Sequence, residues 1–330
     1  SEIVTILVTG ATGFLGSALV TELVRQQQSV RILARDAAKA RAQFGEAVSI
    51  VAGDITNERQ VQEAVDGVSI VYHLVGHLYH PSVPTELYRT THVEGTRTLL
   101  AACQGQQQLQ RIVHCSTTGV FGVTDQTPAD ENAPFAPTNP YEATKLESEL
   151  LALAAYNEQG LPVSIVRPGL VYGPGDLHLL GFFASIKKGL FRVIDGGKAL
   201  LHPIYIDDMT AAFLLCAEKP QAIGNSYNIA DNHPVTIREL SSAIAHALNK
   251  ELPGGSIPLW LANLASDLFS ITPGLKGERA PLTRSRVQFL TNSRVYITNK
   301  ATAELGFLPR VDLEEGMRHT AKWYYAHQYL

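Results

Sequence analysis

ILVTGATGFLG, residues 6–16, is the stretch that decides how this 330-residue chain folds. Its apolar start is typical of a strand that ends at Thr9, and a helix is expected to begin near Phe14. Between them lie three glycines in GxxGxxG spacing, Gly10, Gly13 and Gly16. Residues without a Cβ let the backbone approach a pyrophosphate, and the helix N-terminus adds N–H donors and a positive dipole. The stretch therefore predicts a dinucleotide-binding turn between the first strand and the first helix.

We expect the pyrophosphate to contact this turn and the start of the helix. The residues concerned are Gly10, Thr12, Gly13, Phe14, Leu15 and Gly16. The alternative is a tight strand-to-helix turn that binds nothing, because a glycine triplet by itself is weak evidence.

Downstream of this turn, short β-branched runs alternate with longer segments of helical periodicity. The expected strands are residues 3–8, 29–33, 48–51, 69–74, 111–115 and 163–166. The expected helices include residues 16–26, 93–104 and 141–159. Such alternation predicts an α/β fold, a Rossmann-type doubly wound parallel sheet with helices on both faces.

After about residue 174 the rhythm loosens and glycines and prolines become frequent. Two later stretches, HPIYIDD (202–208) and NSYNIA (225–230), are interpreted as strands that can rejoin the sheet. We expect a dinucleotide-binding domain from residues 1–173 and 199–231. Residues 174–198 and 232–330 then form a smaller, discontinuous substrate-binding part.

The longest apolar stretch, residues 257–271, is interrupted by Asp267 and is too short to span a bilayer. We expect a buried amphipathic helix here. The alternative is the wall or lid of a substrate pocket, because apolar runs are ambiguous.

Composition excludes several classes of protein. Hydrophobic residues make up 45% and charged residues 18%, as in globular domains, and a net charge of −4 gives no footprint for nucleic acid or an anionic membrane. The three cysteines form no CxxC pair and there is no HExxH motif, so we expect neither a disulfide framework nor a metal site. No secretory signal is visible at the N-terminus, and we expect a cytoplasmic protein.

The end of the second expected strand bears on the choice of dinucleotide. NAD binding there uses an acidic residue for the ribose 2′-OH, but this chain has Ala34 followed by Arg35. A guanidinium can hold a 2′-phosphate, and Arg31 and Lys39 can add to a basic patch. We therefore predict NADP. The alternative is NAD, with Asp36 binding the ribose.

The stretch NPYEATK, residues 139–145, places Tyr141 and Lys145 one helical turn apart on the same face. A free tyrosine has a pKa near 10, and a nearby ammonium lowers it. Lys145 can act on the phenol directly or through a cofactor ribose. Tyr141 is thus a candidate to protonate a carbonyl oxygen.

A second stretch, RIVHCSTTG, ends an expected strand in Ser116, Thr117 and Thr118. The carboxyl ends of strands form the ligand crevice of a doubly wound sheet. A hydroxyl in that crevice can hydrogen-bond an oxygen that develops negative charge.

Taken together, these motifs resemble the extended short-chain dehydrogenase/reductase superfamily. That superfamily includes nucleotide-sugar epimerases, dihydroflavonol reductases and 3β-hydroxysteroid dehydrogenases. The matching stretches are TGATGFLG, AGDI, VYHLVG, HVEGTRTLL, NPYEATK, RPGLVYGPGD and ELGFLPRVDLEEGM, so the resemblance covers nearly the whole chain.

The resemblance implies that Tyr141 is the general acid/base, that Lys145 binds the cofactor ribose and tunes the tyrosine, and that Thr117 is the catalytic hydroxyl, with Ser116 as the alternative. It also implies cofactor contacts beyond the glycine turn. Those positions are Arg35, Asp54, Ile55, Leu74, Tyr141, Lys145, Pro168 and Val171. A homodimer is a further expectation from the resemblance.

The chain departs from the superfamily pattern at several positions. His92 and Thr98 stand where asparagines are usual, and Val75–Gly76 replaces two alanines after His73. We expect His92 to be a tolerated change on a helix face, or else to take over a role in holding an active-site water or a backbone carbonyl. His73 is expected to be structural.

Another departure bears on the substrate. Leu201 stands where many nucleotide-sugar enzymes carry an arginine for the diphosphate. We therefore predict an NADPH-dependent carbonyl reductase or alcohol dehydrogenase for a moderately apolar hydroxy or keto compound. The alternatives are a nucleotide-sugar epimerase or dehydratase with tightly bound NAD, and a non-catalytic nucleotide-binding sensor.

Overall fold

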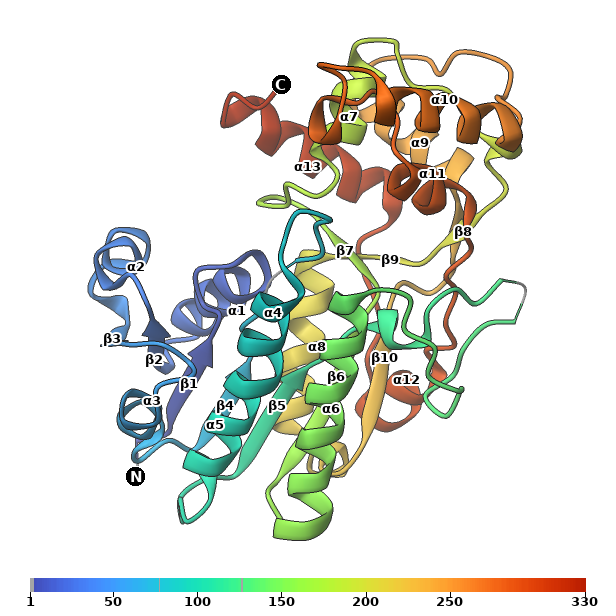
Figure 1. The fold of residues 1–330 in the computed structure, drawn as a ribbon. Coiled ribbons are helices and arrows are strands. Elements are labelled where there is room, and N and C mark those ends of the chain that lie inside the picture. Colours follow the sequence, from blue (N-terminus) through green and yellow to red (C-terminus); the bar gives the residue numbers. More distant parts are fainter. Residues whose placement is uncertain (1–2, 77, 126) are drawn as a thin grey trace.

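A seven-stranded parallel sheet forms the centre of the computed structural model, which describes residues 3–76, 78–125 and 127–330 (Figure 1). From one edge to the other the strand order is β10-β6-β5-β4-β1-β2-β3. The strands are β1 Thr5–Thr9, β2 Ser29–Ala34, β3 Ser49–Ala52, β4 Ile70–His73, β5 Arg111–Cys115, β6 Val163–Pro168 and β10 Ser226–Ile229. The order reverses between β1 and β4, and a crevice outside the carboxyl ends of the strands is where such sheets bind ligands.

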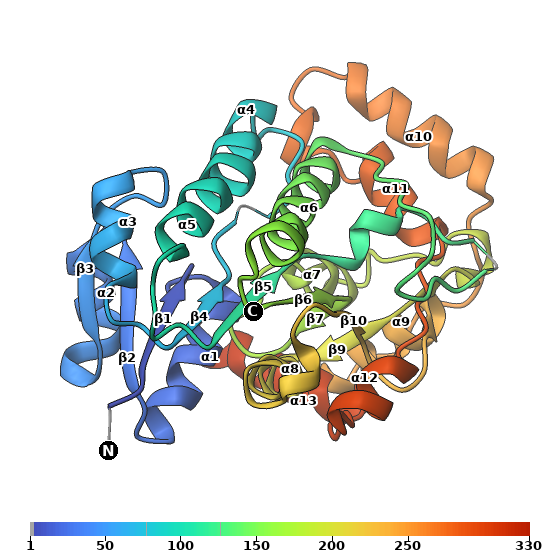
Figure 2. The same ribbon diagram turned by 90° about the horizontal axis from the view of Figure 1, so that it is seen from below.

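Helices cover both faces of this sheet. Figure 2 shows α3, α5 and α6 on one side, and α1 and α8 on the other. These helices are α1 Phe14–Arg25, α3 Glu58–Val65, α5 Gly95–Cys103, α6 Pro140–Gln159 and α8 Ile206–Glu218; α2 is Ala37–Phe44. The side chains of β1 alternate accordingly: Ile6 and Val8 pack with α1 and α8, whereas Leu7 packs with α3 and α5. The predicted doubly wound α/β fold is confirmed.

The later part of the chain forms a lobe above the carboxyl edge of the sheet (Figure 1). Its helices are α7 Leu180–Lys187, α9 Ile237–Ala247, α10 Leu259–Ile271, α11 Arg284–Thr291 and α13 Leu313–Ala326. A separate core of buried apolar side chains holds α7, α9 and α13 together. α12, Asn299–Leu305, instead returns to the main sheet beside β10.

The remaining elements are short. Two strand pairs stand outside the main sheet, β7 Leu170–Tyr172 with β9 Pro203–Tyr205 and β8 Leu200–Leu201 with β11 Val235–Thr236. α4 is Thr85–Tyr88, followed by a π-helical turn, η2, at Arg89–Glu94. The 3₁₀ turns are η1 Gly45–Ala47, η3 Thr118–Phe121, η4 Asp195–Gly197, η5 Pro220–Ala222 and η6 Gly277–Arg279.

One of the two later stretches does not rejoin the main sheet. NSYNIA supplies β10, which pairs with β6 as expected. HPIYIDD supplies only the short β9, which pairs with β7, and from Ile206 onward the chain is already helix α8. The carboxylate of Asp208 accepts bonds from the backbone N–H groups of Arg310 and Val311, both at 3.0 Å. The prediction for residues 202–208 was therefore wrong.

The apolar stretch 257–271 is a helix, but it is not buried. Along α10 only Ala262 and Ser266 are buried, while Trp260 is 67% exposed, Leu268 53% and Ile271 72%. Small side chains face the lobe and large ones face outward, the reverse of an ordinary surface helix. The expected buried helix is corrected to a surface helix. In the described part of the chain, no helix is both long and apolar enough to cross a membrane.

Candidate active site at the carboxyl edge of the sheet

The glycine turn is closely packed against the end of β4. Gly10 has a φ of +70°, and a Cβ there would lie 2.6 Å from the carbonyl carbon and oxygen of Leu74. A Cβ on Gly16 would collide with the Gly10 carbonyl. Gly13 caps α1 without a side chain, so no side-chain cap occupies the first N–H groups of this helix. Such a turn suits a pyrophosphate, which fits the predicted dinucleotide.

A hollow of about 810 Å³ opens beside this turn. Thr12, Gly13 and Phe14 line one side of it, and Asp207 of α8 and Trp323 of α13 line the other. The hollow therefore joins the start of α1 to the C-terminal lobe, a contact that no local sequence pattern indicates.

The end of β2 gives Arg35 and Asp36 different surroundings. Arg35 is exposed and contributes to the lowered pKa of Asp54, which is mainly due to hydrogen bonds from Thr56. Asp36 caps α2 by accepting from the backbone N–H of Lys39 at 3.0 Å. One oxygen of the Asp36 carboxylate therefore serves the helix start.

Arg31 does not join a basic patch around Arg35. Its guanidinium donates to the carbonyl oxygens of Ala64 at 2.8 Å and Asp66 at 2.7 Å, at the end of α3. These carbonyls have no partner inside the helix, which explains why a cation binds them. The expected contribution of Arg31 to the patch was wrong.

Helix α6 brings Tyr141 and Lys145 to the carboxyl edge. The side chain of Asn139 caps the helix and Pro140 opens it, a combination that favours a helix start at this point. Lys145, one turn later, is buried and donates from Nζ to the carbonyl oxygen of Cys115 at 2.6 Å. The ammonium is therefore attached to the end of β5, directly before the hydroxyl residues.

Thr117 and Ser116 point to different partners. The side chain of Thr117 accepts from the N–H of Gly119 at 3.0 Å, and its hydroxyl lies close enough to the phenol of Tyr141 to lower the pKa of that group. Ser116 is buried and donates to Glu149 Oε2 at 2.5 Å. Of the two candidate hydroxyls, Thr117 is the one that lies against the tyrosine.

The acidity of Tyr141 differs from the expectation. Burial raises the pKa of Tyr141, the Cys115 thiol adds to the rise, and the hydrogen bond from Thr117 opposes it. Burial also lowers the pKa of Lys145, whose Nζ is bound to the Cys115 carbonyl. Desolvation is the largest influence on Tyr141, and Lys145 is not among the groups that shift it, so the pKa of the tyrosine moves in the direction opposite to the predicted one.

The other predicted cofactor residues lie along the same edge or next to it. Leu74 follows β4 and donates its N–H to the carbonyl oxygen of Thr9 at 3.2 Å, and Pro168 ends β6. Val171 lies in β7, and Ile55 is buried against Gly95 of α5. The fold thus brings these positions to the end of the sheet that carries the glycine turn.

A buried ion pair behind the hydroxyls was not predicted. Arg167 of β6 and Glu149 of α6 are 2% and 0% exposed in their side chains, and they form a salt bridge that Ser116 joins. The sequence contained a signal for it. Tyr141, Lys145 and Glu149 are spaced i, i+4, i+8 on one helix face, and a charged residue in a buried strand needs a partner.

A second unpredicted ion pair joins the lobe to α6. Arg294, which follows α11, donates to Glu142 Oε2 at 2.8 Å, and Glu142 is buried. Glu142 also accepts from the N–H and the hydroxyl of Thr138. Glu142, the residue next to Tyr141, is thereby held from two sides: locally by Thr138 and by Arg294, which is 152 residues away along the chain.

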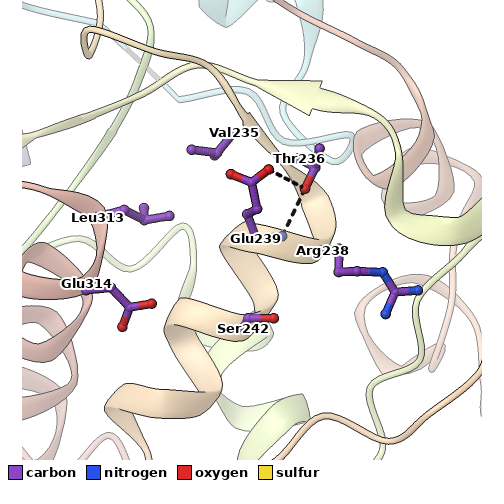
Figure 3. Close-up of a pocket in the computed structure, with 7 residues that line it drawn as sticks. All are labelled: Val235, Thr236, Arg238, Glu239, Ser242, Leu313 and Glu314. Carbon is purple, nitrogen blue, oxygen red and sulfur yellow. Dashed lines mark hydrogen bonds between the residues drawn. The ribbon is translucent and has the colours of Figure 1, made fainter.

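Another hollow, of about 570 Å³, lies between the starts of α9 and α13 (Figure 3). Its lining includes none of the predicted site residues. Thr236 caps α9 there: its Oγ1 accepts from the N–H of Glu239 at 3.0 Å, and its hydroxyl donates to Glu239 Oε1 at 3.2 Å. These polar groups start α9, so we do not assign the site to this hollow.

Comparison with known proteins gives matches over most of the chain. A 3beta-hydroxysteroid-dehydrogenase/decarboxylase of Arabidopsis thaliana is 30% identical, with 95% of this chain and 78% of that protein covered. A 4-hydroxy-2-methyl-3-oxo-4-farnesyl-3,4-dihydroquinoline-1-oxide ketoreductase of Stigmatella aurantiaca is also 30% identical, with 94% and 93% covered. The structure of UDP-glucuronic acid 4-epimerase from Bacillus cereus in complex with NAD has a similar fold, with a TM-score of 0.79, 22% identity and coverage of 99% and 100%.

The family comparison covers the main sheet and the site together. The model of the NAD dependent epimerase/dehydratase family matches residues 6–230, a range that begins in β1 and ends just after β10. The predicted resemblance to the extended short-chain dehydrogenase/reductases is confirmed. The chain belongs to the NAD dependent epimerase/dehydratase family.

Proposed function

We propose that this protein is an NADPH-dependent carbonyl reductase or alcohol dehydrogenase for a moderately apolar hydroxy or keto compound. The observation that carries the proposal is the placement of Thr117, Tyr141 and Lys145: Thr117 follows β5 close to the phenol, and Lys145 lies one turn along α6 with its Nζ on the carbonyl oxygen of Cys115 at 2.6 Å. A tyrosine and a hydroxyl in contact at the carboxyl edge of a parallel sheet suit proton transfer to a carbonyl oxygen.

The bound nicotinamide would supply the hydride, or accept it in the reverse direction. Tyr141 gives its proton to the substrate oxygen, and Thr117 hydrogen-bonds the same oxygen as negative charge develops. Because burial raises the pKa of Tyr141, the phenol keeps its proton at neutral pH, which is the state that reduction requires. Lys145 would hold the nicotinamide ribose, and the buried ion pair of Glu149 and Arg167 keeps α6 and β6 in place.

The residues at the end of β2 support NADP as the cofactor. Arg35 is exposed at this position and is suited to a 2′-phosphate, whereas Asp36 has one carboxylate oxygen on an N–H group in the first turn of α2. We assign the cofactor to residues 1–173 and 199–231, and the substrate to residues 174–198 and 232–330.

Two observations support an apolar substrate. Leu201 is a buried residue of β8, at the position where an arginine would serve a sugar diphosphate. A dianionic group would be costly to bury without a cation at that point. The names of the two relatives describe a 3beta-hydroxysteroid and a farnesylated quinoline, both largely apolar compounds.

The second candidate is an epimerase or dehydratase that keeps NAD bound through a complete turnover. Its support is the likeness to the NAD complex of the sugar epimerase, which at 22% identity is a likeness of fold alone. A non-catalytic nucleotide sensor is the third candidate, although a sensor has no need of the contact between Thr117 and Tyr141.

Mass spectrometry of the dinucleotide released on denaturing the freshly purified protein tests the first two candidates. We expect NADP(H), or no retained dinucleotide and a clear preference for NADPH over NADH on addition. Screening ketones and aldehydes with NADPH would follow. NAD⁺ that survives dialysis would overturn the NADP assignment and favour the epimerase.

A further inference from the structure

His92 lies in the π-helical turn η2, between α4 and α5. Figure 1 shows α4 and α5 as one continuous helix beside α6. The turn is wider than an α-helical one, and the N–H of Gly95 bonds to the carbonyl of Thr90, five residues back. π-helical turns are rare and often occur at functional sites.

The imidazole of His92 is buried against the first turn of α6. Its ring meets the ring of Tyr141 edge to face, with 5.6 Å between centroids, and Tyr88 packs on it at 5.8 Å. Nδ1 lies 2.9 Å from the hydroxyl oxygen of Thr144. Thr144 in turn contacts the carbonyl oxygens of Pro140 at 2.9 Å and Tyr141 at 3.1 Å. His92 therefore contacts both the side chain and, through Thr144, the backbone of the tyrosine.

The contacts of Thr144 favour one tautomer of the neutral imidazole. The single hydroxyl hydrogen of Thr144 goes to the helix carbonyls, so its oxygen accepts from His92. Nδ1 is then the protonated nitrogen, and in the neutral ring Nε2 is the acceptor. The imidazole is thus oriented, with Nε2 directed to the chain that follows β4.

Gly76 explains how the imidazole fits at this point. A Cβ on residue 76 would lie 3.0 Å from His92 Nε2 and 3.4 Å from Cδ2, closer than ordinary contact. The superfamily pattern places alanine at the position of Gly76 and asparagine at that of His92. A single contact relates the two departures, because a Cβ at position 76 would press on the larger ring at position 92 and one of the two would have to give by a few tenths of an ångström.

We propose that His92 is a positioning residue for Tyr141, and that Gly76 is the position that admits it. His92 packs against the tyrosine ring, Gly76 lies behind the imidazole, and Thr117 lies near the phenol hydroxyl. The kinetic consequence rests on the proposed function, but the steric coupling of the two residues does not.

A double-mutant cycle tests the coupling. The proteins are the wild type, Gly76→Ala, His92→Asn and Gly76→Ala/His92→Asn, with Thr98→Asn as the control. Thr98 is the other departure in this helical region, and its hydroxyl donates to the carbonyl oxygen of Glu94 in its own helical turn at 2.9 Å.

We expect Gly76→Ala to lower the melting temperature by several degrees in the wild-type background and to have little effect in the His92→Asn background. The control substitution Thr98→Asn should leave the melting temperature unchanged in both backgrounds. Additive effects of the two substitutions on the melting temperature would overturn the steric pairing.

The position of Tyr141 is read out by ¹⁹F NMR after incorporation of 3-fluorotyrosine, with Tyr141→Phe identifying its signal. We expect both single variants to shift or broaden this signal, and the double variant to resemble His92→Asn in both its melting temperature and its signal. An unmoved signal in His92→Asn would overturn the positioning role, whatever the stability shows.

The kinetic prediction for His92→Asn is a fall in kcat of about tenfold to a hundredfold with little change in the KM for NADPH, because misplacing a catalytic group by about 1 Å costs on the order of a hundredfold. A tenfold to hundredfold rise in the KM for NADPH with an unchanged kcat would contradict this prediction. If the wild type turns over no ketone, the proposed function fails, and the melting temperatures and the ¹⁹F signal still decide the inference.

Discussion

At the scale of single residues, Tyr141 is the side chain on which the proposed chemistry depends. Tyr141→Phe removes the proton donor but keeps the ring that packs on Tyr88 and His92. We expect turnover to fall by about a hundredfold to ten-thousandfold, the usual range for a general acid, with NADPH binding unchanged. Steady-state kinetics and cofactor titration measure the two quantities. Unchanged turnover would leave the sensor as the better account.

His73 is the clearest structural histidine of the site region, as expected. It is buried, Nδ1 lies 2.7 Å from Thr9 Oγ1 and Nε2 lies 2.9 Å from Thr96 Oγ1. Burial lowers the pKa of His73 to about 3, with the Lys145 charge adding to the shift. The ring is therefore neutral throughout the pH range in which the protein would work.

This shift predicts how stability depends on pH. The folded-state pKa of His73 lies below its unfolded value, near 6.5, so the unfolded state binds the proton first as the pH falls. Stability from this group is complete above about pH 6.5 and is lost between there and about pH 3. Urea midpoints of the wild type should fall between pH 7.5 and 5. In His73→Gln the urea midpoint should fall less over the same pH range. An equal or steeper fall would count against His73 as the cause.

At the scale of elements, the pairing of α6 with β6 depends on a buried charge. Arg167→Met leaves Glu149 buried without its cation, and we expect a loss of about 3–5 kcal/mol in the free energy of unfolding. Arg167→Met/Glu149→Met should lose less than the single variant, since both charges are then gone. Denaturant titration of both variants checks this, and a double variant as unstable as the single one would contradict it.

On helix α10 we expect substitutions of large apolar side chains to change stability little, because these side chains are exposed. Leu264 and Leu268 are 47% and 53% exposed, so Leu264→Glu/Leu268→Glu removes little buried surface. We expect the free energy of unfolding to change by about 0.5 kcal/mol or less, with improved solubility. The matched control is Ala262→Glu on the buried face of the same helix, which should destabilise the lobe. If the leucine variant loses as much free energy of unfolding as Ala262→Glu, the two leucines are not on the exposed face of the helix.

At the scale of the whole molecule, the glycine turn, Arg35 and the lobe meet along one edge of the sheet, so a cofactor bound there should stabilise the whole fold. At a concentration of 100 times Kd, NADPH should add about 2.7 kcal/mol, seen as a rise in melting temperature. Arg35→Asp should reverse the preference for NADPH over NADH. Equal rises with both cofactors in the wild type would remove Arg35 from the proposed cofactor choice.

Much of the fold was predictable because its signals are local. The glycine turn, the alternating strands and the helix start at Asn139 and Pro140 all depend on neighbours in the sequence. Errors in the strand bounds were small: β1 begins at Thr5 rather than at residue 3, where Ile3 is exposed. These patterns also carried the family resemblance, which the comparisons confirm.

By itself the sequence determined the doubly wound sheet, the family and the set of residues gathered at the carboxyl edge. Only the tertiary structure decided how those residues act on one another. The choice of Thr117 over Ser116 depends on Glu149, the acidity of Tyr141 depends on burial, and the fit of His92 depends on Gly76. The physical reason is the range of the interactions: periodicity and turn chemistry act between near neighbours, whereas desolvation, steric fit and ion pairing arise between segments that only folding brings together.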